Sequence, residues 1–413
     1  MRRILAVAVC LGAVVAGGAW ASLPGARPLQ ETIERIDYLT FGQGAVPVRV
    51  SGLGATLGVT IEKAVLAADG DPDPFTISLK MMPEDADTEF VYRLPAMTTF
   101  DRFSVPNVLE TPSRFQTFTR AVEIYGSQSS ADDGFILLGS GRLATHPTEG
   151  QLTELITRSM TPVRFVKVRL IGGIQLDNPE MFFEFSEIIG HGTQDVVPLA
   201  QHFTGAWQGR GVSVRLRQSG AAVTGCYDLG GSLKGTVTGG LLRATGVDGR
   251  TGVESLFLLS VIEDGVLLGM RSTNGAPFRV YTGGTAAVST ARCPEPPPPA
   301  LGCGAVIHGI SFGFDSADIL PASEPVLAML YDGLRNDKSA SILIEGHTSS
   351  EGTDTYNRGL SLRRAGAVVS DLVKRGIAAA RLSASGAGES SPMASNADET
   401  GRAMNRRVEV RCK

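Results

Sequence analysis

The amino-acid sequence predicts a multidomain protein in which two all-β domains precede a C-terminal α/β domain. Up to about residue 197, short segments alternate apolar and polar residues with period two, which is typical of strands. From there to residue 292, strand-like segments return about every ten residues between glycine-rich turns. After residue 303, strand-like segments alternate with apolar residues at helical spacing, which indicates an α/β domain.

Residues 1–21 have the pattern of a secretory signal peptide. Arg2 and Arg3 precede an apolar run, and the small residues Ala19 and Ala21 mark a cleavage site. The run is too short to span a bilayer comfortably, although an uncleaved anchor is the alternative. We therefore expect cleavage after Ala21 and export to the periplasm.

The charge of the chain excludes one class of partner. Its 413 residues include 38 basic and 42 acidic side chains, and removal of the signal peptide changes the formal net charge from −4 to −6. A mildly acidic exported chain is not expected to bind nucleic acid. No later stretch is long and apolar enough for a transmembrane helix, so we expect no transmembrane segment in the mature chain.

Residues 29–197 predict an all-β sandwich, because no long helical period interrupts the strand-like segments. Such segments lie at 46–50, 75–80, 120–125 and 163–170. The segments at 121–127, 163–170 and 183–190 resemble the discoidin-type jelly roll, which implies binding of a glycan, a protein or a lipid headgroup. Asp69, Asp71 and Asp73 suggest calcium, but the other ligands of a calcium loop are missing, so we interpret them as an acidic turn.

Residues 198–292 predict an antiparallel meander that forms a small barrel or half-barrel. A membrane barrel is the alternative, but aromatic residues are too sparse for the girdles that it requires. The next segment, 293–302, contains consecutive prolines, which favour a stiff polyproline II spacer. We therefore expect the C-terminal domain, residues 303–413, to be held away from the barrel.

Four cysteines follow the signal segment, and in an oxidising compartment they suggest disulfides in any of three pairings. We favour Cys303 with Cys412, because these residues bracket the C-terminal domain, whose first and last strands should lie close together. Cys226 with Cys293 would then close the middle domain. Free thiols are the alternative.

No motif for catalysis, a cofactor or a metal ion stands out in the chain. The five histidines form no pair with metal-binding spacing, and no serine lies in a nucleophile-elbow pattern. Glycine-rich segments such as 52–58 miss the spacing of dinucleotide-binding loops. We therefore expect a protein that is not an enzyme and that has neither a cofactor nor a metal site.

A series of motifs near the C-terminus is the most specific feature of the chain. It runs from Phe-Gly-Phe-Asp-Ser-Ala at 312–317, through Glu-Gly-His-Thr-Ser-Ser-Glu-Gly at 345–352 and Arg-Arg-Ala at 363–365, to Asn-Arg-Arg-Val-Glu-Val at 405–410. In this order the motifs resemble the OmpA-like peptidoglycan-binding domain, over residues 304–412. The resemblance implies an α/β sandwich that binds the peptide stem of peptidoglycan, usually through its meso-diaminopimelate residue.

The residue pattern places the elements of this domain in an order that agrees with the family. Strands are expected at 310–314, 341–345, 381–387 and 407–411. One helix is expected from residue 320, with Ser323 as its N-cap. A second is expected over 354–375, with Gly376 as its left-handed stop.

The resemblance also implies the residues of a binding site. Arg364 matches the family's ligand-binding arginine, whose planar fork suits a carboxylate. Asp315, Thr348 and Asn357 match positions that line or support the pocket, although Asp315 and Asn357 are equally common turn and cap residues. Arg407 matches a position in the closing strand.

One position departs from the family's pattern, because Ser349 stands where most members have an aspartate. A serine hydroxyl accepts a hydrogen bond from the ligand's ammonium group but brings no charge. The loss costs about 1–2 kcal/mol, or roughly tenfold in affinity. In our hypothesis Glu351, two residues further along the same loop, restores the charge.

These expectations combine into a non-catalytic cell-envelope protein that binds peptidoglycan and is associated with the outer membrane or the cell wall. Its N-terminal β domains would present a second surface for an envelope glycan or an outer-membrane protein. One alternative is a structural subunit of an outer-membrane complex, whose C-terminal domain contacts protein instead of the wall. Another is an exported enzyme with its active site in the β domains.

Overall fold

The computed structural model describes residues 36–413, except 79–81, 84–85, 109–115, 144–150, 174–179, 201, 211, 263–264, 287–299 and 314. The predicted signal peptide and most of the predicted linker lie outside the described residues. Within the described part, no helix is both long and apolar enough to cross a membrane.

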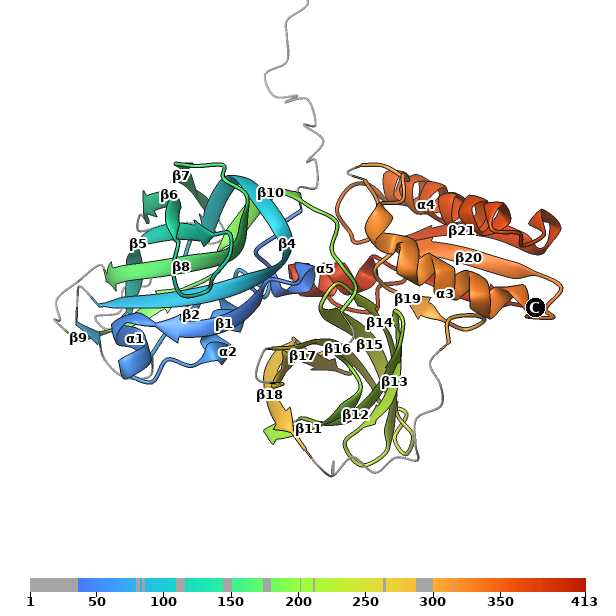
Figure 1. The fold of residues 1–413 in the computed structure, drawn as a ribbon, viewed down its shortest axis with the longest axis horizontal. Helices are drawn as coiled ribbons and strands as arrows, with labels where there is room; N and C mark the ends of the chain where they lie inside the picture. The colour runs from blue at the N-terminus through green and yellow to red at the C-terminus, as the bar shows by residue number, and fades with distance from the viewer. Residues whose placement is uncertain are drawn as a thin grey trace, which may run out of the picture. The chain divides into compact units, whose positions relative to one another are not determined.

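In the residues that the structure describes, the first domain has ten strands and two short α-helices, and Figure 1 shows how they are arranged. The strands are β1 (Val46–Ser51), β2 (Phe75–Thr76), β3 (Met82–Pro83), β4 (Asp87–Pro106), β5 (Gln116–Ser127), β6 (Ile136–Arg142), β7 (Leu152–Thr157), β8 (Val163–Gly173), β9 (Glu180–Phe185) and β10 (Ile189–Gln194). The helices are α1 (Gly52–Thr56) and α2 (Ile61–Leu66), and a 3-10 turn at Phe41–Gln43 precedes β1.

Strand β4 is the central strand of this domain, because it pairs with several other strands. Buried and more exposed residues alternate along much of it, as is typical of a strand with one face in the core. Its first half pairs with β1 and β8, and its second half pairs with β7 and β10. The register with β8 shifts between Arg93 and Thr98, around Pro95, which has no backbone N–H to donate. The domain is mostly β, as predicted, whereas its resemblance to the discoidin jelly roll stays a prediction.

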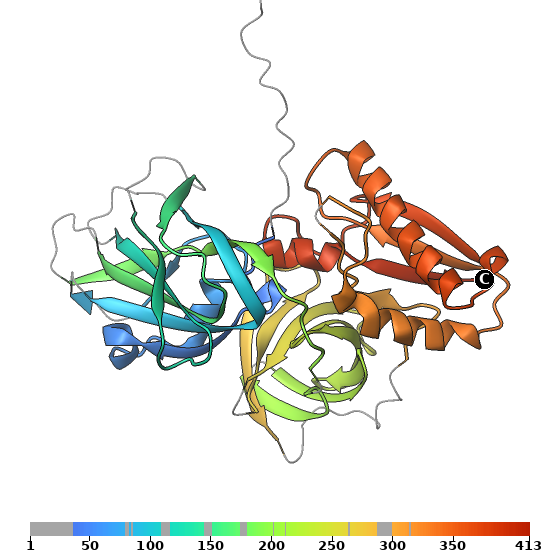
Figure 2. The same ribbon diagram turned by 45° about the horizontal axis from the view of Figure 1, so that its top comes forward.

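The second domain is a closed barrel of eight antiparallel strands, seen nearly end-on in Figure 2. The strands are β11 (Gly205–Arg210), β12 (Val212–Ser219), β13 (Ala222–Tyr227), β14 (Gly231–Thr238), β15 (Leu241–Asp248), β16 (Glu254–Val261), β17 (Leu267–Thr273) and β18 (Arg279–Thr285). Each strand pairs with the next in sequence, and β18 pairs with β11 to close the barrel. Its core is packed with side chains that include Trp207, Tyr227 and Phe257.

The C-terminal domain is an α/β sandwich with two long helices on one face of its sheet (Figure 1). The sheet order is β19 (Val306–Ile307), β22 (Val408–Cys412), β20 (Ile342–His347) and β21 (Leu382–Gly388), with β20 and β21 parallel. The helices are α3 (Glu324–Arg335) and α4 (Asp354–Lys374), followed by a short α5 (Glu399–Asn405). Apolar side chains of α3 and α4 form one core with the sheet.

Two local predictions for this domain are wrong. The first strand is Val306–Ile307 rather than 310–314, and Phe312 makes only an isolated bridge to Ile319. Ser323 precedes α3 but does not cap it, because its hydroxyl instead bonds the backbone N–H and carbonyl of Ser311. Gly376, in contrast, has φ of +113° at the end of α4, in the left-handed region that was predicted for it.

A disulfide joins Cys303 to Cys412, with a Cα–Cα distance of 5.5 Å, as predicted. It connects the residues just before β19 to the end of β22, and these two strands are neighbours in the sheet. Cys226 is also disulfide-bonded. Its predicted partner, Cys293, lies outside the described residues.

The prediction that the linker holds the C-terminal domain away from the barrel is wrong. One buried apolar cluster contains Phe41 and Val65 from the first domain, Leu241 and Leu258 from the barrel, and Met404 from α5. We call this cluster the junction core. Burial of apolar surface is favourable by about 25 cal/mol per Å², and the stiffness of a spacer does not prevent the elements on either side from packing.

Candidate functional site

The loop between β20 and α4 carries Ser349 and Glu351. It ends at Thr353, whose hydroxyl caps α4 by accepting a backbone hydrogen bond at 3.2 Å. Asn357, in the first turn of α4, donates to the carbonyl of Ser349 at 3.3 Å and to the carboxylate of Glu389. These contacts fix the loop at the end of the sheet.

Three of the predicted site residues, in this loop or in the first turn of α4, are buried. Thr348, Ser349 and Asn357 are only 5%, 2% and 1% exposed. Ser349 Oγ donates to Glu351 Oε2 at 3.2 Å. The three buried residues therefore support the loop from inside, and Glu351 is the residue that extends from it.

A cavity of about 470 Å³ lies beside the loop. Asp315, Glu351, Arg364 and Arg407 are the predicted site residues in its lining. The remainder of the lining comes from the other two domains as well as from this one, so a ligand in the cavity would touch more than the C-terminal domain.

Arg364 lies half-buried on α4 at the cavity wall. Its Nε donates to the carbonyl of Ser316 at 3.2 Å, and its guanidinium carbon lies 5.1 Å from the centroid of the Phe312 ring. A cation–π contact of this kind orients the guanidinium plane. Arg363 beside it is exposed, as expected for a solvated helix arginine.

Asp315 lies at a turn with φ of +45°, a region that aspartate tolerates better than most residues. Its carboxylate accepts a hydrogen bond from the hydroxyl of Tyr356 on α4. This bond to a carboxylate, together with partial burial, raises the pKa of Tyr356 above its ordinary value. Asp315 is thus held close to Tyr356 in the first turn of α4, and it lines the same cavity as Arg364.

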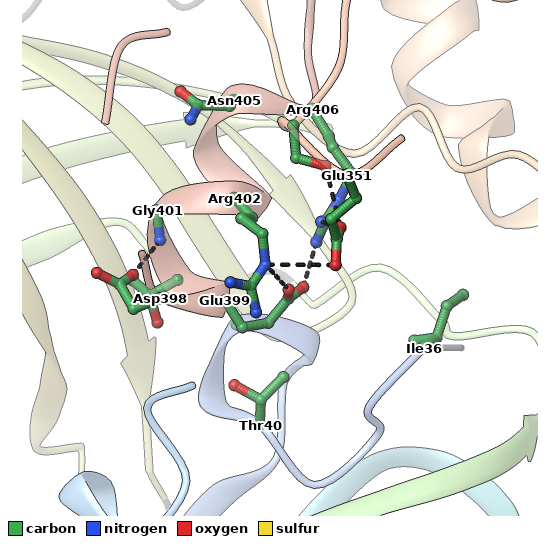
Figure 3. A network of polar contacts seen from close by, with 12 residues as sticks. Ile36, Thr40, Glu351, Asp398, Glu399, Gly401, Arg402, Asn405 and Arg406 are labelled. Carbon is green, nitrogen blue, oxygen red and sulfur yellow. Dashed lines mark hydrogen bonds and ion pairs between the residues drawn. The ribbon is translucent and has the colours of Figure 1, made fainter. Parts of the chain in front are cut away.

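Glu351 belongs to a network of ion pairs with α5 (Figure 3). Arg402 Nε lies 2.9 Å from Glu399 and 3.7 Å from Glu351, while Arg406 pairs with the same two carboxylates. Burial alone would raise the pKa of Glu399, but the charges and hydrogen bonds of Arg406 and Arg402 outweigh it and lower that pKa. The contacts of both arginines to Glu351 are longer than their contacts to Glu399.

Arg407 makes its hydrogen bonds within the domain, although the sequence predicted it in the binding site. Its Nε and Nη2 donate to Glu409 Oε1 at 2.9 and 2.7 Å. The guanidinium also donates to the carbonyls of Asn405 and Ser391, and the residue is only 7% exposed. An arginine with these partners stabilises the end of the sheet, and a ligand would have to break a buried ion pair to recruit it.

One group of side chains in this region has metal-like spacing. The ligand atoms of Glu345, His347 and Glu409 lie within 4.8 Å of one another. However, Arg407 donates to Glu409, and Arg411 lies 2.5 Å from Glu345. Burial and the charge of Arg407 lower the pKa of His347 to about 4, so the ring is neutral at physiological pH. We therefore interpret the two carboxylates as the ion-pair partners of Arg407 and Arg411, with a neutral His347 beside them.

Comparison with known proteins agrees with the motifs that line this cavity. Residues 311–406 match the OmpA family. The matched range thus includes the loop, α4 and α5, with Asp315, Glu351 and Arg364 inside it, and it ends just before the closing strand β22.

Two curated relatives share this region. Outer membrane porin F of Pseudomonas fluorescens is 45% identical over 101 residues, which cover 24% of this chain and 31% of the porin. Peptidoglycan-binding protein ArfA of Mycobacterium bovis is 38% identical over 129 residues, or 29% of this chain and 40% of ArfA. The chain therefore spans well under half the length of these relatives.

Among solved structures, the peptidoglycan-associated lipoprotein from Burkholderia pseudomallei is similar to this chain with a TM-score of 0.24 and 31% identity. The match covers 26% of this chain and 90% of the lipoprotein chain.

Sequence reasoning missed several residues of the site. Tyr356 and Phe312 were visible in the motifs, but nothing local shows that one bonds Asp315 and the other stacks on Arg364. The pair Arg402 and Arg406 had a detectable signal. Their spacing of four places them on one face of a helix, and the aspartate at 398 before them is an N-cap, which accepts from the backbone of Gly401.

Proposed function

We propose that this protein is a non-catalytic cell-envelope protein that binds the peptide stem of peptidoglycan in its OmpA-like domain. The observation that carries the proposal is the position of Arg364, oriented by Phe312 and Ser316 on the wall of a cavity that Asp315 and Glu351 share. A relative that is named as peptidoglycan-binding, ArfA, supports it.

The chemistry of diaminopimelate suits these side chains. Its free end carries a carboxylate and an ammonium group on one carbon, so a binding site needs a cation and an acceptor close together. Arg364 offers a planar pair of N–H donors for the carboxylate. Glu351 is the acceptor that we assign to the ammonium group, because its side chain is 40% exposed whereas Ser349 is buried beneath it.

Retention on purified sacculi tests the role of Arg364. We expect Arg364→Ala to weaken binding by about 1.5–3 kcal/mol, or roughly tenfold to a hundredfold, because a charge-assisted bidentate contact is lost. Arg363→Ala is the matched control, since this neighbour is exposed and should bind like the wild type. Equal retention of Arg364→Ala and wild type would favour the structural-subunit alternative, in which the domain contacts protein.

The role of Glu351 is tested by titrating a soluble muramyl tripeptide that ends in diaminopimelate. Glu351→Gln removes the charge but keeps the shape, and we expect it to bind about tenfold more weakly. Adding Ser349→Asp to this variant should recover the lost affinity, since it restores the acid at the family's usual position. Unchanged affinity of Glu351→Gln would remove this residue from the site.

The remaining parts of the proposal concern the rest of the chain. We propose that residues 1–21 direct export and are cleaved after Ala21, and that the N-terminal β domains present a surface for an envelope glycan or protein. Sequencing the N-terminus of the protein recovered from periplasm and cell wall tests the cleavage and the localisation together.

A further inference from the structure

Three carboxyl groups of the first β domain lie close to the cavity of the OmpA-like domain. Glu187, between β9 and β10, is only 3% exposed and lines the cavity together with Asp37. Asp69, in the acidic turn before β2, acts electrostatically on Glu187. The proposed wall-binding function uses none of these residues.

Glu187 is incompletely satisfied. It accepts a backbone hydrogen bond from Gly70, but its Oε1 has no hydrogen-bond partner in the described part of the chain. Asp37, in contrast, accepts two backbone hydrogen bonds, from Leu39 at 2.9 Å and Gly190 at 2.8 Å. A buried carboxylate oxygen without a hydrogen-bond donor costs free energy, so a ligand that donates a hydrogen bond to this atom would remove that cost.

The electrostatic surroundings of these acids are negative. Burial, followed by the charges of Asp37 and Asp69, raises the pKa of Glu187 well above its ordinary range. Burial raises the pKa of Asp37 to about 7, with a further contribution from the charge of Glu399. No basic side chain appears among the main groups that act on Glu187 or Asp37.

The nearby arginines are engaged elsewhere. Arg402 and Arg406 bind Glu399 and Glu351, and Arg243 donates to the carbonyl of Gly42. A cationic group that entered the cavity would therefore meet carboxyl groups whose pKa values burial has raised, and it would favour their ionised forms.

We propose that the first β domain supplies a cation subsite to this cavity, in which Glu187 and Asp37 accept the ammonium group of an amine ligand. An ammonium group fits better than a divalent metal ion. The carboxyl oxygens of Glu187, Asp37 and Asp69 do not form one of the groups with metal spacing in the described part of the chain. An ammonium group donates hydrogen bonds of about 2.8 Å in several directions, so it reaches oxygens that are further apart.

Calorimetric titration with 1,5-diaminopentane tests the subsite in the full-length mature protein. At pH 7 we expect binding to release protons, because the acids are partly protonated when free and ionised when paired with the cation. For the same reason affinity should increase as the pH rises through 7. The number of protons is obtained by repeating the titration in buffers of different ionisation enthalpy.

Glu187→Gln is the decisive variant, since glutamine has the shape of the protonated acid and should preserve the fold. We expect it to lower affinity about tenfold or more and to reduce the proton release. Asp195→Asn is the matched control, because Asp195 is exposed in the same cavity lining and should behave like the wild type. Absence of diamine binding, or the same affinity and proton release in Glu187→Gln, would overturn the subsite.

A second pair of titrations identifies the source of the amine and does not depend on the diamine. Muramyl tripeptide with a free diaminopimelate amine is compared with the same peptide after acetylation of that amine. Proton release with the free peptide that is lost in Glu187→Gln assigns the subsite to the wall stem and moves its free ammonium group from Glu351 to Glu187. Release with the diamine alone assigns it to free amines. The retention of Arg364→Ala on sacculi tests wall binding separately, so failure of either proposal is recognisable.

Discussion

Replacement of Arg407 by alanine should strongly destabilise the OmpA-like domain rather than remove a ligand contact. The guanidinium of Arg407 is buried against Glu409 and also donates to the carbonyls of Asn405 and Ser391. Without it, the carboxylate of Glu409 loses its closest cation at the edge of the core. Removal of one partner of a buried ion pair typically costs about 3–5 kcal/mol. Urea unfolding followed by circular dichroism measures the loss.

Arg411→Ala is the control for this experiment. Arg411 lies 3.2 Å from the same Glu409, but its side chain is 56% exposed, so its loss should cost only about 0–1 kcal/mol. If Arg407→Ala and Arg411→Ala destabilise the protein equally little, the buried ion pair is not what holds this end of the sheet. A stable Arg407→Ala protein with weakened sacculus binding would instead return Arg407 to the ligand site.

Removal of the disulfide between Cys303 and Cys412 should be the second large effect. The bond closes a loop with a sequence separation of 109 residues, and in the chain-entropy view such a constraint mainly reduces the freedom of the unfolded state. The double variant Cys303→Ser with Cys412→Ser should therefore lose about 2–5 kcal/mol of unfolding free energy. Denaturant unfolding under oxidising conditions measures it.

The measurement has an internal control. Adding a reductant should destabilise the wild type by more than it destabilises the double variant, because only the wild type has this bond to lose. The disulfide of Cys226 is present in both proteins and is exposed to the reductant in both, so the difference between their responses isolates the C-terminal bond. An unfolding midpoint that is the same in wild type and double variant would show that the closing strands need no covalent constraint.

The parts of the fold that the sequence predicted well are those with strong local signals. Helix α4 has apolar residues at helical spacing, and it ends before a glycine in the left-handed region. The cysteines that bracket the C-terminal domain were paired correctly, because the first and last strands of such a sandwich are neighbours. In the β domains, period-two alternation identified strands, but it does not state which strands pair.

Both local errors arose because the structure of a segment depends on partners elsewhere in the chain. Ser323 has the residue type and position of an N-cap, yet its hydroxyl is taken by the backbone of Ser311. The first strand was placed on 310–314 because that segment is apolar, whereas the sheet pairs with Val306–Ile307 beside the disulfide. Neither choice is encoded within the segment itself.

In the candidate site, too, the sequence identifies a residue but does not state which partners the residue has. Arg364 follows from its motif position and Glu351 from its proximity to Ser349 in the loop, and both lie on the cavity. Arg407 also matched by position, but its partner Glu409 lies on the same strand face and takes its hydrogen bonds. Glu187 could not have been found from the sequence, since its importance depends on elements far along the chain that bury it and leave one oxygen without a donor.

The junction core changes how the protein would respond to tension if it is fixed to the wall. Phe41, Leu241 and Met404 pack together although they belong to three different domains. A force applied between an anchored OmpA-like domain and the β domains would first meet this packed apolar contact. The three domains would then stay together at low force and separate at high force.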